Sequence, residues 1–259
     1  MPQLLDLSNL IKQRNNKTLY ALKINNDPED TSGAKLLESA AKLASATDNK
    51  LIQIMKCDLN ISNCIIDTVQ ANKITDLIVG IHHKANIVDT FLGGTITALI
   101  NGTSHQNLII YGPKRPVNSV KRLVVTVPQM AELEIGFDLW FDRVKNIASQ
   151  LSIPIVFYAN KTTTEALKKQ CEIHSSLNVS FRELASWEDF LIISKDIKHS
   201  DTLIVITARK ATMSYNNLFE KIPYYLNKYF ADNNFLLIYP QQTAPDGTDN
   251  DIYNPLKIS

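Results

Sequence analysis

The fold of this chain is most clearly indicated by the stretch TDLIVGIHHK at residues 75–84. Its apolar run Leu77-Ile78-Val79 predicts a strand buried on both faces, which is typical of parallel sheets. Gly80 follows the run, and Gly93-Gly94-Thr95 stands near the expected start of the next helix. Ligands of open α/β sheets bind at the carboxyl ends of strands. The stretch therefore predicts both an inner strand and a candidate binding site.

Short β-branched runs alternate with longer amphipathic stretches on both sides of this strand. The alternation predicts an α/β fold of βαβ units, with mainly parallel sheets flanked by helices. Helical patterns are expected, for example, at 34–46 and 132–151. The expected strands are 18–24, 51–57, 76–81, 107–111, 122–127, 154–158, 178–181, 202–207 and 235–239.

A turn-rich segment at 112–119 reads as a linker near the middle of the chain. The strand and helix rhythm restarts at Arg122, so we predict a divergent duplication with halves at residues 1–113 and 114–259. The halves are expected to be related by a pseudo-twofold axis and to meet through their last strands or neighbouring helices. The second half is expected to end in a loose tail from Gln241 onward.

The two halves differ in their number of expected strands, with four in the first and five in the second. The chain opens on a helical face of apolar residues, so the first half lacks the strand that should precede it. Either the sequence begins part-way through the fold, or the first half has a smaller sheet. That opening face consists of Leu4, Leu5, Leu7, Leu10 and Ile11.

The composition is that of an ordinary core-forming protein. The 259 residues include 27 basic and 26 acidic side chains, a balance that gives no reason to expect a nucleic-acid partner. Three cysteines fit no metal or redox spacing and favour a reducing compartment, with Cys57 and Cys64 expected in the core. No apolar run approaches the roughly 18 residues needed to cross a bilayer, so this chain alone is expected to be soluble.

The candidate site combines glycines with a helix start. Glycines let backbone N–H groups approach phosphate oxygens, and a helix N-terminus adds a favourable dipole. The hydroxyl of Thr95 could donate a further hydrogen bond. The expected binding residues are Gly80, His83, Gly93, Gly94 and Thr95.

This pattern resembles the nucleotide loop of universal stress proteins that bind ATP. Those proteins carry Gly, two residues, Gly, nine residues, Gly, and then Ser or Thr. Gly80 and Gly93 fit the first and third glycines, whereas His83 replaces the second glycine and Gly94 the Ser or Thr, with Thr95 one place late. The resemblance implies ATP or another adenine nucleotide as the ligand of the first half, with a degenerate loop.

A wider resemblance covers nearly the whole chain. Four stretches are similar to the paired stress-protein domains that follow the membrane part of bacterial Na⁺ or K⁺/proton antiporters: DLIVGIHHK at 76–84, RPVNSVKRLVVTVP at 115–128, EIGFDLW at 134–140 and FLLIYP at 235–240. The resemblance implies two tandem universal-stress-protein-like (adenine nucleotide alpha hydrolase-like) halves. It also implies a regulatory, ligand-sensing module on the cytoplasmic face of the inner membrane, trimmed from a longer protein. Its partner would be the membrane-spanning antiporter part of the same polypeptide; a homodimer is left open.

The second half contains an equivalent loop that has fewer features of a binding site. The equivalent loop at 207–214 has no glycine. Arg209 and Lys210 could meet an anion, but a solvated loop is expected from the habits of such residues. Ser214 is expected to cap a helix rather than act as a nucleophile. We therefore predict that this half is structural.

No catalytic or metal-binding arrangement is apparent in the sequence. The adjacent His82 and His83 would point to opposite sides of a strand, so no metal site is expected. Asp76 fits a capping or solvated role as well as a functional one. We expect no enzymatic activity. Two alternatives stay open: a freestanding universal stress protein, and a nucleotide hydrolase of the same α/β class, which would need intact phosphate glycines and a convergent acid or base.

Overall fold

The computed structural model describes residues 2–12, 18–25, 32–47, 49–81, 94–173 and 177–243. Every expected strand is present, with its ends displaced by no more than two residues. The strands are β1 (Leu19–Asn25), β2 (Leu51–Cys57), β3 (Asp76–Gly80), β4 (Asn107–Gly112), β5 (Arg122–Thr126), β6 (Ile155–Ala159), β7 (Val179–Glu183), β8 (Asp201–Ile206) and β9 (Asn234–Tyr239).

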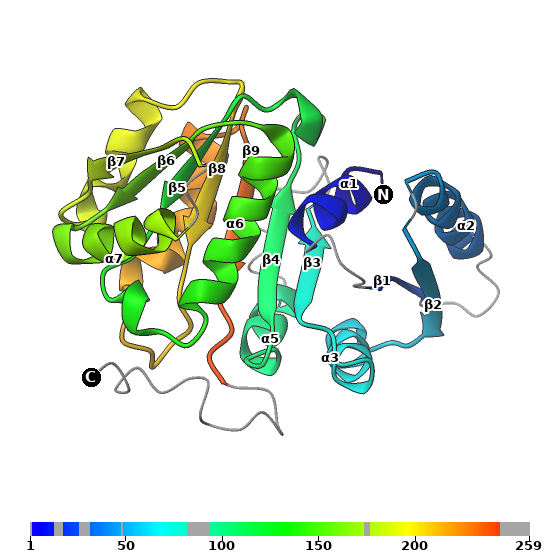
Figure 1. Cartoon of the computed structure of the whole chain (residues 1–259). Helices are drawn as coiled ribbons and strands as arrows, with labels where there is room; N and C mark the ends of the chain where they lie inside the picture. The colour runs from blue at the N-terminus through cyan, green and yellow to red at the C-terminus, as the bar shows by residue number, and fades with distance from the viewer. Residues whose placement is uncertain are drawn as a thin grey trace.

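These strands form two sheets (Figure 1). Seven of them make one sheet in the order β3-β4-β9-β8-β5-β6-β7, and β1 and β2 form a separate parallel pair. Within the large sheet every pairing is parallel except that between β4 and β9. The prediction of an α/β fold with mainly parallel strands is confirmed.

Helices cover both faces of the large sheet. One face carries α1 (Pro2–Ile11), α6 (Phe137–Leu151) and α7 (Lys161–Glu172). The other carries α3 (Ile61–Ala71), α5 (Thr95–Gly102), η3 (Trp187–Lys195), η4 (Asn217–Lys221) and α8 (Ile222–Tyr229). The remaining long helix, α2 (Ser32–Ser45), packs on β1 and β2.

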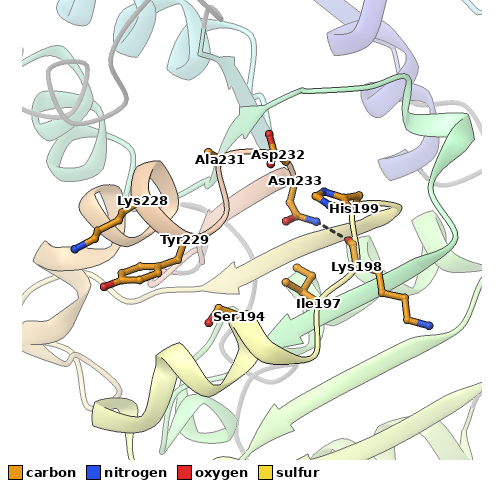
Figure 2. A pocket seen from close by; sticks show the side chains of 9 residues that line it. All are labelled: Ser194, Ile197, Lys198, His199, Lys228, Tyr229, Ala231, Asp232 and Asn233. Carbon is orange, nitrogen blue, oxygen red and sulfur yellow. Dashed lines mark hydrogen bonds between the residues drawn. The ribbon is translucent and has the colours of Figure 1, made fainter.

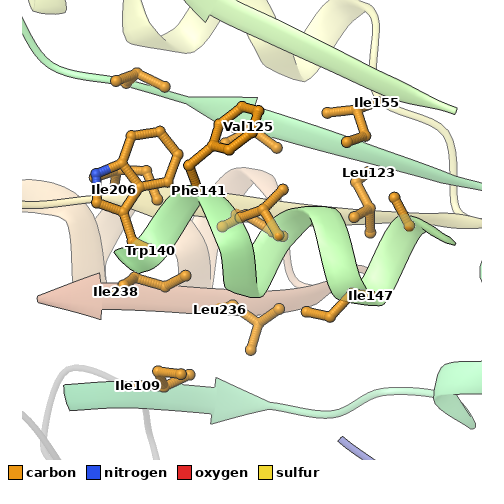
Figure 3. Close-up of a cluster of buried hydrophobic side chains, with 14 of the residues drawn as sticks. Ile109, Leu123, Val125, Trp140, Phe141, Ile147, Ile155, Ile206, Leu236 and Ile238 are labelled. Carbon is orange, nitrogen blue, oxygen red and sulfur yellow. The ribbon is translucent and has the colours of Figure 1, made fainter. Parts of the chain in front are cut away.

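Alternate side chains along the strands belong to two separate hydrophobic cores, one on each face of the large sheet. In β5, Leu123 and Val125 point toward α6, while Val124 belongs to the core on the opposite face. Figure 3 shows α6 laying Trp140 and Phe141 over the strands on its side of the sheet. Because both faces are covered, the inner strands are continuously apolar, which explains why they could be located from sequence.

The strand order differs between the two parts of the chain. Residues after 113 form the consecutive arrangement β7-β6-β5-β8-β9. The earlier residues form β2-β1 and β3-β4, and no described strand lies between β1 and β3 in either sheet. The earlier part would match the later one if a single strand stood at that place. The sequence predicts that the first half lacks its first strand, and no strand of the described residues stands at this place.

The two last strands, β4 and β9, meet in the antiparallel pairing, which is one of the two contacts that the sequence left open. Two buried asparagines stabilise this pairing, because each accepts hydrogen bonds from the segment that follows the other strand. Asn107, at the start of β4, accepts a hydrogen bond from the backbone N–H of Gln241, which follows β9. Asn234, at the start of β9, accepts hydrogen bonds from Lys114 and Arg115, which follow β4. A duplication would leave this symmetry; the division at residue 113 stays a prediction.

The connecting segments are packed where the structure describes them. In the linker at 112–119, Val117 is buried, and the backbone N–H groups of Lys114 and Arg115 donate to Asn234. The tail is not loose at its start, since Gln241 is buried against Asn107. Residues 244–259 lie outside the described part of the chain.

Candidate functional site

The predicted site lies at the carboxyl end of β3, where Gly80 is the last strand residue. A Cβ atom at Gly80 would stand 3.1 Å from Leu4 of α1, so the absence of a side chain lets that helix pack close to the strand. The small size of Gly80 therefore has a structural use on one face of the strand. His83 and Gly93, together with His82, lie outside the described residues.

Gly94 and Thr95 form the start of α5, where the sequence placed them. Gly94 has a φ of 75°, in the left-handed region that glycine adopts without strain, and no atom of the described residues lies within 4 Å of where its Cβ would be. No side chain caps this helix start among the described residues. Among the residues that the structure describes, the first N–H groups of α5 therefore have no intrahelical or side-chain partner.

Asp76 stands at the opposite end of β3 and is neither a cap nor a solvated residue. Its carboxylate accepts hydrogen bonds from Arg143 of α6 at 2.8 and 2.9 Å, and a third from Asn107 at 3.0 Å. Burial alone would raise the pKa of Asp76. The hydrogen bonds and charge of Arg143 outweigh that effect, with help from Asn107 and Thr75, and hold the pKa below its usual value. This pair is an ionic bond between β3 and α6.

In the later part of the chain the equivalent place, at the carboxyl end of β8, is occupied by the side chain of Arg209. We call these two places, at the carboxyl ends of β3 and β8, the two corners of the fold. The expectation of a solvated loop is wrong for Arg209, which is only 5% exposed, although Lys210 beside it is exposed. Burial lowers the pKa of Arg209 to about 10. Its guanidinium donates to the carbonyl oxygens of Pro240, Ile100, Thr103 and Gln106.

The reason for this burial lies in the end of α5. The last carbonyl groups of a helix have no intrahelical donor and need a partner from elsewhere. A planar guanidinium with five N–H donors satisfies several carbonyls at once. Arg209 thereby joins the loop after β8 to the end of α5, and most of its donors are used by the protein itself.

A second contact closes the same corner. Glu134 accepts hydrogen bonds from the backbone N–H of Ser214 at 2.9 Å and from its hydroxyl at 2.8 Å. The expected capping role of Ser214 is therefore wrong, and Asn216 caps η4 instead. Gly136 sits so close to the end of β9 that a Cβ atom there would be 2.4 Å from the carbonyl oxygen of Gln241.

Groups of reactive side chains are scarce in the described part of the chain. No cluster of three or more His, Cys, Asp or Glu side chains there could hold a metal ion. The described cysteines are all free thiols; Cys64 is buried as expected, whereas Cys57 is exposed, so its expected core position is wrong. The expectations of no metal and no enzymatic activity stay predictions.

One shallow pocket of about 490 Å³ lies at the other end of the strands, beside the starts of β8 and β9 (Figure 2). It is lined by Ser194, Ile197, Lys198, His199, Lys228, Tyr229, Ala231, Asp232 and Asn233. Within this lining, the side-chain amide of Asn233 donates a hydrogen bond to the carbonyl oxygen of Lys198 at 2.7 Å. No predicted binding residue borders this pocket, and its wall carries charges of both signs.

Sequence reasoning missed Arg143 and Glu134, and it placed Arg209 in a solvated loop. Their partners lie far away along the chain, as with Arg143 and Asp76, which are 67 residues apart. One signal was available: LIV recurs at 77–79 and 203–205, on equivalent strands. When the two runs are aligned, Arg209 stands at the position of His83, which indicates that Arg209 lies at the place equivalent to the predicted site.

The comparisons with known proteins agree with this architecture. No protein-family model matches the chain, and no curated protein matches its sequence. Among solved structures, the cytoplasmic domain of a prokaryotic cation chloride cotransporter has a TM-score of 0.65 at 11% identity, over 91% of this chain and 89% of that one. A putative universal stress protein from Pseudomonas aeruginosa UCBPP-PA14 has a TM-score of 0.60 at 13% identity, over 92% and 88%.

A universal stress protein from Archaeoglobus fulgidus DSM 4304 is also similar, with a TM-score of 0.55 at 12% identity, over 92% of this chain and 90% of that one. None of the described helices combines the length and apolar character needed to cross a membrane. At such low identity the likeness concerns the fold alone. The chain thus has the α/β fold of universal stress proteins, which the cytoplasmic domain of a transporter also adopts.

Proposed function

We propose that this chain is a regulatory module, without turnover of its own, that senses a ligand for a cation/proton antiporter. The observation that carries the proposal is the contrast between two equivalent corners of the fold. After β8 the corner is occupied by Arg209 and by the Glu134–Ser214 hydrogen bonds. After β3 the next helix, α5, starts at Gly94, and no side chain of the described residues caps that start.

A ligand bound there would be an anion, and an adenine nucleotide is our choice. Open N–H groups at a helix start attract phosphate oxygens. Gly80, His83, Gly93, Gly94 and Thr95 are the residues we assign to this contact. The similarity to a transporter's cytoplasmic domain supports the regulatory setting, at the level of fold.

The proposed partner is the membrane-spanning antiporter part of the same polypeptide, with this module on the cytoplasmic side. A ligand shifts an equilibrium between conformations only by binding one of them more tightly. Coupling of this kind is typically about 1–3 kcal/mol, or several-fold to about a hundredfold in relative populations.

Calorimetry with ATP, ADP, AMP and cyclic dinucleotides tests the ligand. We expect binding of one adenine nucleotide per chain and its loss in Gly94→Val, with a thermal melt to show that the variant is folded. Lys210→Ala in the equivalent later loop is the matched control and should bind normally. Absence of binding by the unmodified chain would contradict the sensing role.

Transport by the full-length antiporter in vesicles, with and without the residues equivalent to this chain, tests the regulatory role. We expect deletion to change the ion or pH dependence of transport. Unchanged dependence at normal protein levels would remove the regulatory proposal.

A further inference from the structure

The pocket beside the starts of β8 and β9 carries an inference about a small molecule other than a nucleotide (Figure 2). It lies between the end of η3, the end of α8 and the turns that lead from these helices into β8 and β9. Its volume of about 490 Å³ is within the range typical of small-molecule sites. It shares no residue with the proposed nucleotide contact, so its own side chains determine what it can bind.

The side-chain amide of Asn233 has a fixed orientation in this pocket. Asn233 is only 5% exposed, and its amide nitrogen donates to the carbonyl oxygens of Lys198 at 2.7 Å and of Asp201 at 3.2 Å. Because a carbonyl oxygen can only accept, the amide cannot be turned round. Its oxygen, Oδ1, receives no hydrogen bond from the described residues. Figure 2 shows this oxygen turned away from Lys198, on the side of the pocket where Tyr229 lies.

Ser194 of η3 adds a second acceptor to the lining of the pocket. Its hydroxyl donates to the carbonyl oxygen of Leu191 at 2.7 Å, so its proton is used and its lone pairs are left for a donor. A buried amide oxygen without a partner costs free energy, so Asn233 and Ser194 together favour a ligand that donates hydrogen bonds. A primary ammonium group has three N–H donors and can serve both oxygens at once.

Basic side chains stand on two sides of these acceptors. Lys228 lies on one side, where its Nζ is 5.2 Å from the ring centroid of Tyr229. Lys198 and His199 lie on the other side (Figure 2). The lining holds two lysines against one aspartate, Asp232, so its net charge is +1 when His199 is neutral. A ligand of complementary charge therefore carries one more negative group than positive groups, with negative groups toward both sides.

We propose that this pocket binds an acidic amino acid, aspartate or glutamate. Each of these carries two carboxylates and one ammonium group at neutral pH. The ammonium group donates to Oδ1 of Asn233 and to the hydroxyl oxygen of Ser194. One carboxylate meets Lys228 and the other meets Lys198, while the methylene groups lie against Ile197. The proposal does not depend on nucleotide binding or on transport.

Calorimetry of the full chain with L-glutamate and L-aspartate, at low ionic strength, tests the proposal. We expect saturable binding of at least one of them, with one molecule per chain. Glutarate is glutamate without its ammonium group, and it should bind at least about tenfold more weakly, because the oxygen of Asn233 keeps no donor. Glutamine, which lacks the second negative charge, should bind about fivefold more weakly than glutamate.

Variants of the lining separate the two kinds of contact. Ser194→Ala should weaken glutamate binding about fivefold and leave glutarate binding unchanged, because only the ammonium group contacts the hydroxyl oxygen. Lys228→Met should weaken the binding of both ligands by the same factor, because both carry the carboxylate that it meets. Lys169→Met, on an exposed lysine of α7 on the other face of the sheet, is the matched control and should bind normally. Thermal melts show whether each variant is folded.

The side-chain amide of Asn233 gives a second readout, which needs no variant. Its proton and nitrogen resonances should shift on saturation with glutamate, and shift much less with glutarate at the same concentration. Resonances of Asn233 that do not move at saturation would overturn the assignment of the site. The proposal is also wrong if neither amino acid binds, if glutarate binds as tightly as glutamate, or if Lys169→Met weakens binding as much as Lys228→Met does.

Discussion

The strands β3 and β8 have nearly the same sequence at their centres but different surroundings. Both contain Leu-Ile-Val, and each pairs in parallel with the last strand of its part of the chain. Yet β8 is fully buried between two neighbouring strands, whereas β3 is half-buried and has one neighbour among the described strands. The comparison shows that an apolar run predicts a strand reliably, while its burial depends on what stands beside it.

The largest effect is expected when the equivalent leucines of the two strands, Leu203 and Leu77, are truncated. Leu203→Ala in β8 should lower the free energy of unfolding by about 4 kcal/mol, because it leaves a cavity in a closed core, and Leu77→Ala in β3 by about 2 kcal/mol. Urea denaturation of both variants measures this. Equal losses would mean that β3 is as well packed as β8 in solution.

The next test removes the ionic bond that fixes β3 to α6. Asp76→Asn should cost about 3 kcal/mol at neutral pH, because it leaves Arg143, 4% exposed, without its carboxylate. Asp67→Asn, an exposed carboxylate on α3, is the control and should change little.

The pH dependence of Asp76 follows from its lowered pKa. The folded-state pKa lies below the unfolded value of about 3.9, so the stabilisation is present above that value. It is lost as the pH falls through the folded-state pKa. Stability curves of the unmodified chain and Asp76→Asn should therefore approach each other in acid. Parallel curves would contradict the ionic role.

A smaller effect is expected from the arginine that fills the later corner. Arg209→Met should lower the free energy of unfolding by about 2–3 kcal/mol, because the carbonyls that it serves lose their donor. Lys210→Met, on the exposed neighbour, should have little effect. If Arg209→Met instead gained nucleotide binding without loss of stability, the contrast between the two corners would rest on this side chain alone.

The smallest effects are expected for substitutions of two glycines, Gly136 and Gly94. Gly136→Ala should cost about 2 kcal/mol through overpacking against Gln241. Gly94→Ala meets no neighbour among the described residues and should cost about 1 kcal/mol, from its left-handed φ. Thermal melts rank the two. A larger loss at Gly94 would show that its turn is more tightly surrounded than this structure has it.

The fold was more predictable than the site for a physical reason. Strands such as 51–57 and 202–207 are marked by their own apolar residues, so the local pattern sufficed. The Asp76–Arg143 pair and the Arg209 contacts join residues that are 67 or more than 100 positions apart, and no local pattern records them. Of the predicted site, Gly80, Gly94 and Thr95 lie at the end of β3 and the start of α5, and His83 and Gly93 lie outside the described residues.

The reciprocal asparagines have a consequence for the order of synthesis. Asn107 receives its partner from Gln241, 134 residues later, and β4 receives its antiparallel neighbour only when β9 exists. Until then β4, fully buried in the finished molecule, exposes an apolar edge on the growing chain. The early part must therefore wait, incompletely closed, until the 134 residues from Asn107 to Gln241 have been made. A chaperone that shields strand edges would act on this chain at that stage rather than after release.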